Sequence, residues 1–314
     1  MLERNEGSMK KKLLFVFNPH SGKAQIKNQL LGILDTMVKA GYEVTAYPTQ
    51  CVGDAKEKVE QEASQYDLVV CSGGDGTLDE TVAGIMNCEE KIPLGYIPAG
   101  STNDFANSLG IPKDMEKAAD VAVTGKSFPC DVGSFNGSYF VYVAAFGLFT
   151  EVSYKTSQQW KNMLGHAAYI LEGAKHLHDI PAYLMQVEYN GVRIQDEFIY
   201  GMITNSTSVG GFKGMTGKDV LLDDGVFEVT LIKKPRNPIE LNEIIASLIN
   251  LVDDTDLVYS FKTDEIKIIS KNEIAWTLDG EFGGDQTEVL IRNQKQAIEI
   301  MVKDEERSNE IVEK

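Results

Sequence analysis

The sequence has few basic residues, no paired cysteines and no long apolar runs. Lysine and arginine number 30 against 47 aspartates and glutamates, which gives a formal net charge of −17. Because contacts to phosphate backbones need lysine and arginine, this balance argues against a nucleic-acid partner and against broad adhesion to an anionic membrane. None of the four cysteines forms a CxxC pair, which disfavours a disulfide scaffold and a cysteine zinc site.

No stretch approaches the roughly 18 consecutive apolar residues of a membrane-spanning helix, so we expect none. The start of the chain carries no apolar segment followed by a small-residue cleavage site, so we expect a reducing, cytoplasmic location. Met9 is an alternative start to Met1. Hydrophobic residues make up 43% of the sequence and charged residues 25%, which is typical of a globular protein. The length of 314 residues indicates two domains.

Two common nucleotide-binding fingerprints are also missing. There is no GxxxxGK[ST], because the Gly22-Lys23 pair lacks the first glycine, and there is no GxGxxG. A Walker-type phosphate loop is therefore excluded, and a dehydrogenase lacks its fingerprint.

The first 125 residues alternate strand and helix patterns. Apolar runs at residues 12–17, 42–47, 66–71 and 92–97 predict strands, and the third does not alternate, as expected for a strand covered on both faces. Between the strands, apolar side chains recur at helical spacing, and Gly41 is placed to end the first helix. This order predicts a parallel sheet wrapped by helices.

After about residue 133, short strand patterns separated by turns dominate. The Asn190-Gly191 pair predicts a hairpin, and helical patterns interrupt the strands at residues 159–178 and 238–252. An antiparallel β domain is the natural interpretation.

We therefore predict a chain that is α/β plus all-β. Residues 9–132 form an N-terminal doubly wound α/β nucleotide-binding domain, and residues 133–296 form a C-terminal antiparallel β-sandwich domain. The last apolar run fits either domain; in the first case residues 297–312 rejoin the α/β domain.

Three loops rich in Gly, Ser, Thr or Asn follow predicted parallel strands. They read NPHSGK after the first strand, SGGDGT after the third and PAGSTND after the fourth. Ligands of open α/β sheets bind at this edge, and helix N-termini that open from such loops favour phosphate. Three loops together predict a nucleotide-phosphate site more strongly than one glycine-rich turn would.

Asp75 is unexpected in such a loop, because a carboxylate repels phosphate. It could hold Mg²⁺ between itself and the phosphates, or it could orient or deprotonate an attacking hydroxyl. The alternative is a turn aspartate that bonds its own backbone. Beside two further phosphate-type loops, we favour a functional role.

Two clusters of basic residues could dock locally at an anionic surface. They are Lys10 to Lys12, and Lys233 and Lys234 with Arg236. We favour an ordinary solvated surface for both.

The motifs NPHSGK, GGDGTLDE and PAGSTNDFA together resemble the catalytic domain of the diacylglycerol kinase family of lipid kinases. The resemblance continues into VYVAAFG, GGFKG, LLDDGVFEV and TLDGE, so it covers nearly the whole chain. The layout is most similar to the soluble bacterial diacylglycerol kinases. GGDGT alone is shared with phosphofructokinases and NAD kinases, but its combination with PAGSTNDFA and a late LDGE is a strong signal.

The resemblance implies ATP as phosphoryl donor and Mg²⁺ as cofactor. The nucleotide-binding positions that it implies are Asn18, Pro19, His20, Ser21, Gly22, Thr49, Gly73, Gly74, Asp75, Gly76, Thr77, Leu78, Asp79 and Ser101. It also implies a structural Mg²⁺ held by the side chain of Asp224 and by main-chain oxygens of Leu221 and Val226. Glu281 is implied as the general base, with Asp279 close by and Asp75 as a third catalytic carboxylate.

One position departs from the family pattern. The family usually has asparagine where this chain has Asp79, which could recruit a cation or cap the following helix, and we favour capping. His20 occupies a variable position, so we expect its main chain and not its imidazole to face phosphate.

The expected reaction transfers the γ-phosphoryl group of ATP to the hydroxyl of diacylglycerol, giving phosphatidic acid, with ATP in a cleft between the domains. The lipid would be met at a membrane surface by peripheral contact, and a homodimer is an open alternative. Phe146, Leu148 and Phe149 could line the lipid entry, although we favour ordinary core for them. Alternative functions are a kinase for a sphingoid base, ceramide or phosphatidylglycerol, a soluble-substrate kinase of the NAD kinase or phosphofructokinase type, or a non-catalytic nucleotide-binding regulator.

Overall fold

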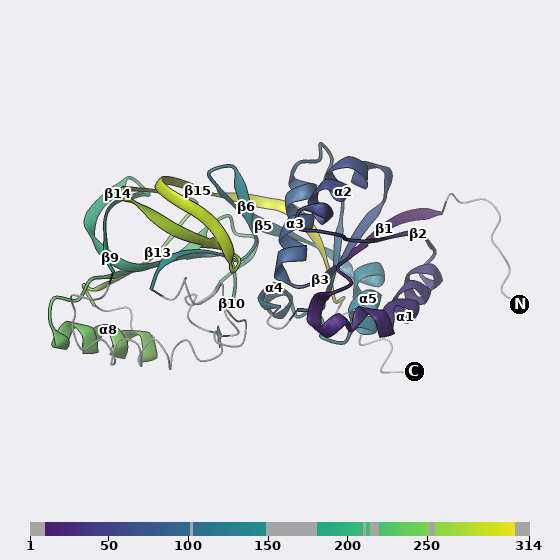
Figure 1. Cartoon of the computed structure of the whole chain (residues 1–314), viewed down its shortest axis with the longest axis horizontal. Coiled ribbons are helices and arrows are strands. Elements are labelled where there is room, and N and C mark those ends of the chain that lie inside the picture. Colours follow the sequence, from purple (N-terminus) through teal and green to yellow (C-terminus); the bar gives the residue numbers. More distant parts are fainter. Residues whose placement is uncertain are drawn as a thin grey trace, which may run out of the picture. The chain divides into compact units, whose positions relative to one another are not determined.

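The computed structural model describes residues 10–100, 103–148, 181–209, 212–213, 220–250 and 255–304 (Figure 1). The chain divides into two compact units. Unit 1 comprises residues 1–100, 109–129 and 298–314, and unit 2 comprises residues 101–108 and 130–297. Among the described residues, no helix has the length and apolar character needed to cross a bilayer.

Unit 1 alternates strands with helices, as the sequence predicts. Its elements are β1 (Lys11–Phe17), η1 (Ser21–Ala24), α1 (Ile26–Lys39), β2 (Tyr42–Pro48), α2 (Asp54–Glu62), η2 (Ala63–Gln65), β3 (Leu68–Gly73), α3 (Asp75–Met86), β4 (Leu94–Pro98) and α5 (Met115–Thr124). The strands form a sheet in the order β2-β1-β3-β4 with every pairing parallel. The end of the long strand β15 (Glu281–Val302) adds to this sheet, because Ile300 pairs with Leu94 of β4 in parallel.

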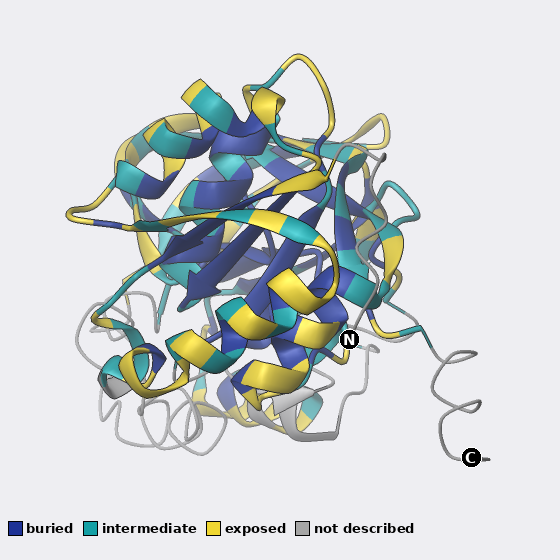
Figure 2. Cartoon of the chain, turned by 90° about the vertical axis from the view of Figure 1, so that its right-hand side faces the viewer, coloured by how far each residue is buried: buried dark blue, intermediate teal, exposed yellow. Residues whose placement is uncertain are grey.

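The sheet of unit 1 is covered on both faces. Strands β3 and β4 are buried along their whole length, whereas the edge strand β2 consists of half-buried and exposed residues. Figure 2 shows the dark-blue strands surrounded by helices whose outer faces are yellow and teal. This two-sided burial explains why the third predicted strand lacks alternation.

The helix predictions for this unit hold with one exception. Helix α1 ends at Lys39, and Gly41 follows it with φ +94°, the left-handed conformation that glycine adopts most readily. Ala55, Val59 and Ala63 are fully buried on one side of the next helical segment. The exception is Val38: the apolar residues of this helix recur at helical spacing, yet Val38 is 58% exposed and lies outside the buried face.

Unit 2 is dominated by antiparallel strands. Its elements are α4 (Asp104–Ser108), β5 (Lys126–Phe135, which begins in unit 1), β6 (Ser138–Phe140), β7 (Val143–Gly147), β8 (Tyr183–Tyr189), β9 (Val192–Thr204), β10 (Ser208–Val209), β11 (Phe212–Lys213), β12 (Phe227–Lys233), α8 (Pro238–Asn250), β13 (Val258–Thr263), β14 (Glu265–Leu278) and most of β15. The strand order is β13-β12-β9-β7-β14-β15, and β8 pairs with both β14 and β9. The helix predicted at residues 159–178 lies outside the described residues.

One predicted turn of unit 2 is present, and one strand is irregular in its middle. The Asn190-Gly191 hairpin is confirmed: both residues have positive φ, and Tyr189 pairs with Val192 across the turn. The polar middle of β14 coincides with a break in its register with β15, between Ile269 and Ile274. The strand continues through this irregularity, as strands do at β-bulges.

The core of unit 2 is aromatic. Trp276 is fully buried with its ring centroid 4.8 Å from Phe146 and 5.1 Å from Phe135. Phe146 is also fully buried, so its side chain belongs to this core, as we favoured, and does not line a surface entry. Leu148 is half-buried, and Phe149 lies outside the described residues.

Candidate active site

The three glycine-rich loops of unit 1 begin side by side. Phe17 pairs with Ser72 and Gly73 pairs with Pro98, so β1, β3 and β4 end at the same level of the sheet. Two backbone hydrogen bonds extend this alignment past the strands: the Asn18 N–H donates to the Ser72 carbonyl at 2.9 Å, and the Ala99 N–H donates to the Gly73 carbonyl at 2.8 Å. The first two loops and the start of the third, residues 98–100, therefore meet at this edge of unit 1.

The first loop packs directly against the other two. Gly22 has φ +54°, and a Cβ atom there would lie only 1.7 Å from the Ala99 carbonyl oxygen, so no other residue fits without movement. The Ser21 hydroxyl accepts a hydrogen bond from the Gly74 N–H at 3.3 Å. The His20 N–H donates to the Asn18 side chain at 2.9 Å and the imidazole is exposed, so this main-chain amide is engaged inside the loop.

The diglycine loop opens directly into helix α3. Gly74 is the N-cap, and its carbonyl accepts the N–H groups of Thr77 and Leu78 at 3.1 and 3.2 Å. An α-helix leaves its first N–H groups without an intrahelical acceptor, and its dipole makes this end positive. The start of α3, where Asp75 and Gly76 lie, therefore suits an anionic ligand such as phosphate.

The position and burial of residues in α3 change the predictions for Asp79 and Leu78. Asp79 lies one turn inside the helix, so the capping role that we favoured for it is wrong. Leu78 is fully buried, so its side chain packs in the core and cannot contact a ligand. Asp75 and Asp79 are both half-buried.

A buried tyrosine is hydrogen-bonded to the diglycine loop. The Tyr96 hydroxyl donates to the Gly73 carbonyl at 3.2 Å, and the residue is 1% exposed. Burial raises the pKa of Tyr96 well above its usual value, and the charges of Asp75, Cys71 and Asp79 raise it further. Burial likewise raises the pKa of Cys71 to about 12. Both groups therefore stay protonated at neutral pH, and neither is a nucleophile.

Thr49 follows β2 beside the first loop. Its N–H donates to the Phe17 carbonyl at 2.9 Å, and the residue is buried. The turn after it is attached to α3, because the Glu80 carboxylate accepts from the N–H groups of Gly53 and Ala55 at 2.7 and 3.2 Å. Glu80 was not singled out from the sequence, where nothing distinguishes it from a solvated helix residue.

In unit 2, the two carboxylates of the LDGE motif have different surroundings. Asp279 and Gly280 have φ values of +49° and +89° and form the tight turn between β14 and β15. Glu281 is the first residue of β15 and is exposed. Asp279 is 4% exposed, and its carboxylate accepts hydrogen bonds from the backbone N–H groups of Val141, Tyr142 and Val143.

A buried aspartate also organises the segment from Leu221 to Val226. The Asp131 carboxylate accepts from the N–H groups of Gly225 and Gln296, both at 2.7 Å, and the Asp131 N–H donates to the Leu222 carbonyl at 2.8 Å. Burial is the main cause of the raised pKa of Asp131, and the nearby charge of Asp224 adds to it. Asp131 was missed in the sequence, although a lone aspartate in the apolar run of β5 is a signal that could have identified it.

The Asp224 carboxylate has a backbone amide and a lysine as its neighbours. One carboxylate oxygen accepts from the Val226 N–H at 3.1 Å, and the other lies 3.9 Å from the Lys262 ammonium, which is closer to Glu228 at 3.0 Å. Burial raises the pKa of Glu228 despite this partner. Among the described residues, no group of three or more His, Cys, Asp or Glu side chains is arranged to hold a metal. A Mg²⁺ here would need main-chain oxygens as well as Asp224, which is the donor set that the family resemblance implies.

Curated proteins similar to this chain are diacylglycerol kinases. One from Bacillus subtilis is 36% identical over 278 residues, covering 87% of this chain and 91% of its own length. One from Staphylococcus carnosus is 35% identical over 308 residues, covering 97% and 99%. The chain belongs to the diacylglycerol kinase family. It is therefore a kinase, and the family model for the diacylglycerol kinase catalytic domain matches its residues 12–135.

Solved structures agree with this family assignment at the level of the fold. A crystal structure of a diacylglycerol kinase from Bacillus anthracis has a TM-score of 0.73 at 22% identity, covering 94% of this chain and 98% of its own. Another from the same organism has a TM-score of 0.78 at 24% identity, covering 96% and 98%. At these identities the likeness shows the fold alone.

Ser101 lies outside the described residues. The side chain of Leu221 is 55% exposed, and the part that the resemblance implies for this residue is a main-chain oxygen.

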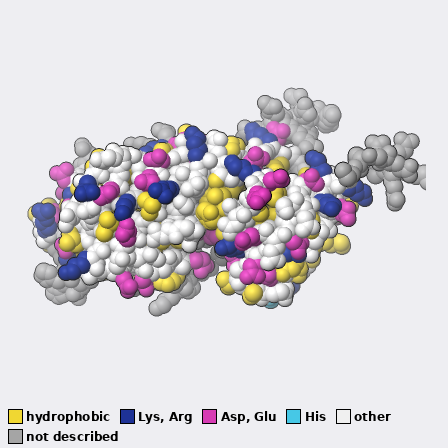
Figure 3. All heavy atoms as spheres, turned by 90° about the horizontal axis from the view of Figure 1, so that it is seen from above, with side chains coloured by type: hydrophobic (Ala, Val, Ile, Leu, Met, Phe, Trp, Pro, Cys, Tyr) yellow, Lys and Arg dark blue, Asp and Glu magenta, His cyan; other side chains and the backbone are white. Residues whose placement is uncertain are grey.

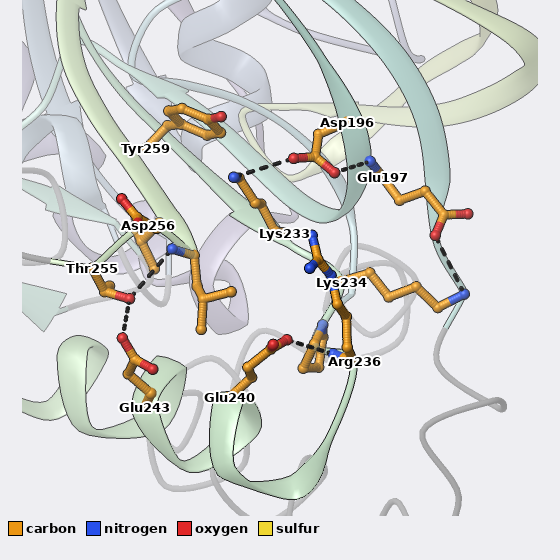
Figure 4. A pocket seen from close by; sticks show the side chains of 13 residues that line it. Asp196, Glu197, Lys233, Lys234, Arg236, Glu240, Glu243, Thr255, Asp256 and Tyr259 are labelled. Atoms are coloured by element: carbon orange, nitrogen blue, oxygen red, sulfur yellow. Dashed lines mark hydrogen bonds and ion pairs between the residues drawn. The ribbon is translucent and has the colours of Figure 1, made fainter.

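The basic cluster at residues 233–236 lies in a cavity of about 1070 Å³ in unit 2 (Figure 4). Its lysines have acidic partners, because Lys233 lies 3.1 Å from Asp196 and Lys234 lies 3.9 Å from Glu197. The cavity is lined by five acidic and three basic side chains, so it does not form the anion-docking patch that the sequence left open. On the face seen in Figure 3, lysine and arginine side chains are likewise interspersed with aspartate and glutamate.

Proposed function

We propose that this chain transfers the γ-phosphoryl group of ATP to the hydroxyl of diacylglycerol and so produces phosphatidic acid. The observation that carries the proposal is that two glycine-rich loops and the start of a third meet at the ends of β1, β3 and β4, beside the N-terminus of α3. Backbone N–H groups, the helix dipole and small side chains at one edge of a parallel sheet suit a polyphosphate. The choice of diacylglycerol follows the names of the relatives.

In this proposal the loops of unit 1 hold the phosphates of ATP by their backbones. Gly22 and Gly74 allow the close packing of the loops, and Tyr96 fixes the Gly73 carbonyl so that the diglycine turn keeps its shape. Mg²⁺ bound with the nucleotide would neutralise phosphate charge, with Asp75 at the start of α3 as its protein partner. This role resolves the presence of a carboxylate in an anion-binding loop.

Glu281 serves as the general base. Its exposure leaves the carboxylate accessible to a substrate hydroxyl, whereas the buried Asp279 is committed to backbone amides. The proton of the lipid hydroxyl passes to Glu281 while its oxygen bonds to the γ-phosphorus, and the bond from that phosphorus to the bridging oxygen of ADP breaks. Such a reaction requires mainly positioning and charge stabilisation, which fits a site without a covalent nucleophile.

Asp224 is proposed as the side-chain ligand of a structural Mg²⁺, with main-chain oxygens of Leu221 and Val226. Asp131 fixes the backbone of this segment through Gly225 and Leu222, so the donors are held in place before a metal binds.

The decisive experiment gives purified protein labelled ATP, Mg²⁺ and mixed micelles. The micelles contain diacylglycerol, ceramide, sphingosine, phosphatidylglycerol or no lipid, and NAD and fructose 6-phosphate serve as soluble acceptors. We expect Mg²⁺-dependent formation of labelled phosphatidic acid. Transfer to another lipid would correct the substrate and keep the mechanism, whereas transfer only to a soluble acceptor would overturn the proposal. An absence of transfer to every acceptor, with ATP still bound, would favour a non-catalytic regulator.

The same assay tests whether anionic lipids attract the enzyme to the micelle surface. With a net charge of −17 and the lysines at 233 and 234 paired to acidic side chains, we expect little stimulation by anionic micelles. Any stimulation must come from a local patch and should fade with salt, because exposed charges are screened within about 10 Å at 0.1 M ionic strength.

A further inference from the structure

The turn between β14 and β15 determines where Glu281 points. Asp279 and Gly280 are its two central residues, and Leu278 pairs directly with Glu281 across it. The direction of a side chain next to a two-residue turn follows from the φ and ψ angles of that turn. Whatever fixes Asp279 and Gly280 therefore also fixes the backbone of Glu281 and the direction in which its side chain leaves the strand.

The Asp279 side chain is held from the neighbouring segment by three consecutive amides. One oxygen accepts from the N–H groups of Tyr142 and Val143 at 2.9 and 2.8 Å, and the other accepts from the Val141 N–H. The Asp279 N–H in turn donates to the Val143 carbonyl at 2.8 Å. A carboxylate that is buried and engaged at both oxygens is poorly placed to receive a proton from a substrate.

Tyr142 forms a second link between the two segments, from its side chain to the backbone of Asp279. Its hydroxyl donates to the Asp279 carbonyl at 2.9 Å and lies 3.8 Å from where a Cβ atom on Gly280 would be. Its own backbone is anchored, because its carbonyl accepts the Asn205 N–H at 3.0 Å and the residue is 6% exposed. The Asp279 side chain thus holds the Tyr142 backbone, and the Tyr142 side chain holds the Asp279 backbone.

We infer that Asp279 and Tyr142 are positioning residues that act through Glu281, and that Asp279 is not itself a proton acceptor. The inference rests on the proposed function, because it presumes that Glu281 is the base. It assigns a role to Tyr142, which lies in the VYVAAFG motif but for which the resemblance implies no function, and it separates the roles of the two carboxylates in the LDGE motif.

The first test is Tyr142→Phe, which removes one hydroxyl and leaves the ring in the core. A small displacement of a base lowers turnover, and we expect kcat to fall about tenfold. The KM values for ATP and for diacylglycerol should stay within about twofold, because neither binding contact is touched. Tyr139→Phe is the matched control on the neighbouring strand β6 and should leave kcat unchanged.

The second test repeats Tyr142→Phe and Asp279→Asn in a Glu281→Gln background. If Tyr142 and Asp279 act only through Glu281, substituting them should not lower kcat further once the Glu281 carboxylate is lost. The kcat of each double variant should therefore equal that of Glu281→Gln alone. Equal fold-losses with and without Glu281 would overturn the inference, because a general structural role or an independent base produces that result. Normal kcat in Tyr142→Phe would also overturn it.

The proposed function and this inference fail in different ways. If Glu281→Gln keeps full turnover, the base assignment in the proposed function is wrong and the inference falls with it. If Glu281→Gln is strongly impaired while Tyr142→Phe behaves like Tyr139→Phe, the proposed function stands and only the inference falls.

Discussion

The two units assemble their chemical groups in opposite ways. In unit 1, the candidate phosphate site is made mostly of backbone, from three loops that follow adjacent parallel strands. In unit 2, the important groups are carboxylates, each fixed by amides from segments far away in sequence: Asp279 by residues 141–143, and Asp131 by Gly225 and Gln296. The comparison teaches that a backbone-built site depends on small residues, whereas a carboxylate site depends on long-range hydrogen bonds.

Glu281→Gln should give the largest effect, because it removes the one exposed carboxylate of unit 2 assigned to proton transfer. A general base contributes about 10²- to 10⁴-fold, so we expect kcat to fall by that factor while ATP affinity is unchanged. Steady-state kinetics and calorimetry of ATP binding would measure both. Glu273→Gln, an exposed position on β14, is the control. A collapse of ATP binding with normal residual turnover would instead make Glu281 a nucleotide contact.

Asp75→Asn examines the one charged residue that opens α3 at the backbone-built site. The substitution keeps size and helix position, so we expect an unchanged melting temperature and a loss of turnover of about 10²-fold if Asp75 handles Mg²⁺ or the attacking hydroxyl. Asp120→Asn, on the exposed face of α5, should have no effect. Near-native turnover in Asp75→Asn would return this aspartate to the status of a structural residue at the start of a helix.

Gly22→Ala should disturb the packing of the loops without touching any charge. The added Cβ would lie 1.7 Å from the Ala99 carbonyl oxygen, so the first and third loops must move apart. We expect the KM for ATP to rise about tenfold and stability to fall by about 1–3 kcal/mol. Gly41→Ala shares the positive φ but has no atom within 4 Å, so it separates conformational strain from lost packing. Equal ATP kinetics in the two variants would contradict a backbone-built site.

Asp224→Ala should have the smallest effect on chemistry, because the metal proposed there is structural. We expect a chelator, without nucleotide, to lower the melting temperature of the wild type by a few degrees and to leave Asp224→Ala unaffected. Asp285→Ala, at an exposed site on β15, should respond to chelator like the wild type. A wild-type melting temperature that does not change with chelator would contradict a structural metal in this segment.

The difference between the units also explains which parts could be predicted from sequence. The loops NPHSGK, SGGDGT and PAGSTND each follow an apolar strand directly, so local pattern and the rule for parallel sheets were enough to place the first two together with the start of the third. The start of α3 could not be placed in the same way, because Asp75 and Gly76 belong to the SGGDGT loop pattern, whereas the helix begins at Asp75 with Gly74 as its N-cap.

In unit 2, the sequence identified Asp279 and Glu281 only through family resemblance. The Asp279-Gly280 pair is itself a hairpin signal, but we predicted a hairpin only at Asn190-Gly191, so the turn before Glu281 was missed. Nothing local indicates that Tyr142 and Asp279 hold one another, because they are 137 residues apart.

The sequence by itself determined the alternation of strands and helices in the first unit, the antiparallel character of the second and the position of the phosphate loops, because these follow from local periodicity and turn chemistry. Only the tertiary structure decided which carboxylates are available for chemistry. Asp75, Asp131, Asp279 and Glu281 are the same kinds of group in the sequence. Burial and backbone amides commit Asp131 and Asp279 to holding the fold, and the turn leaves Glu281 exposed.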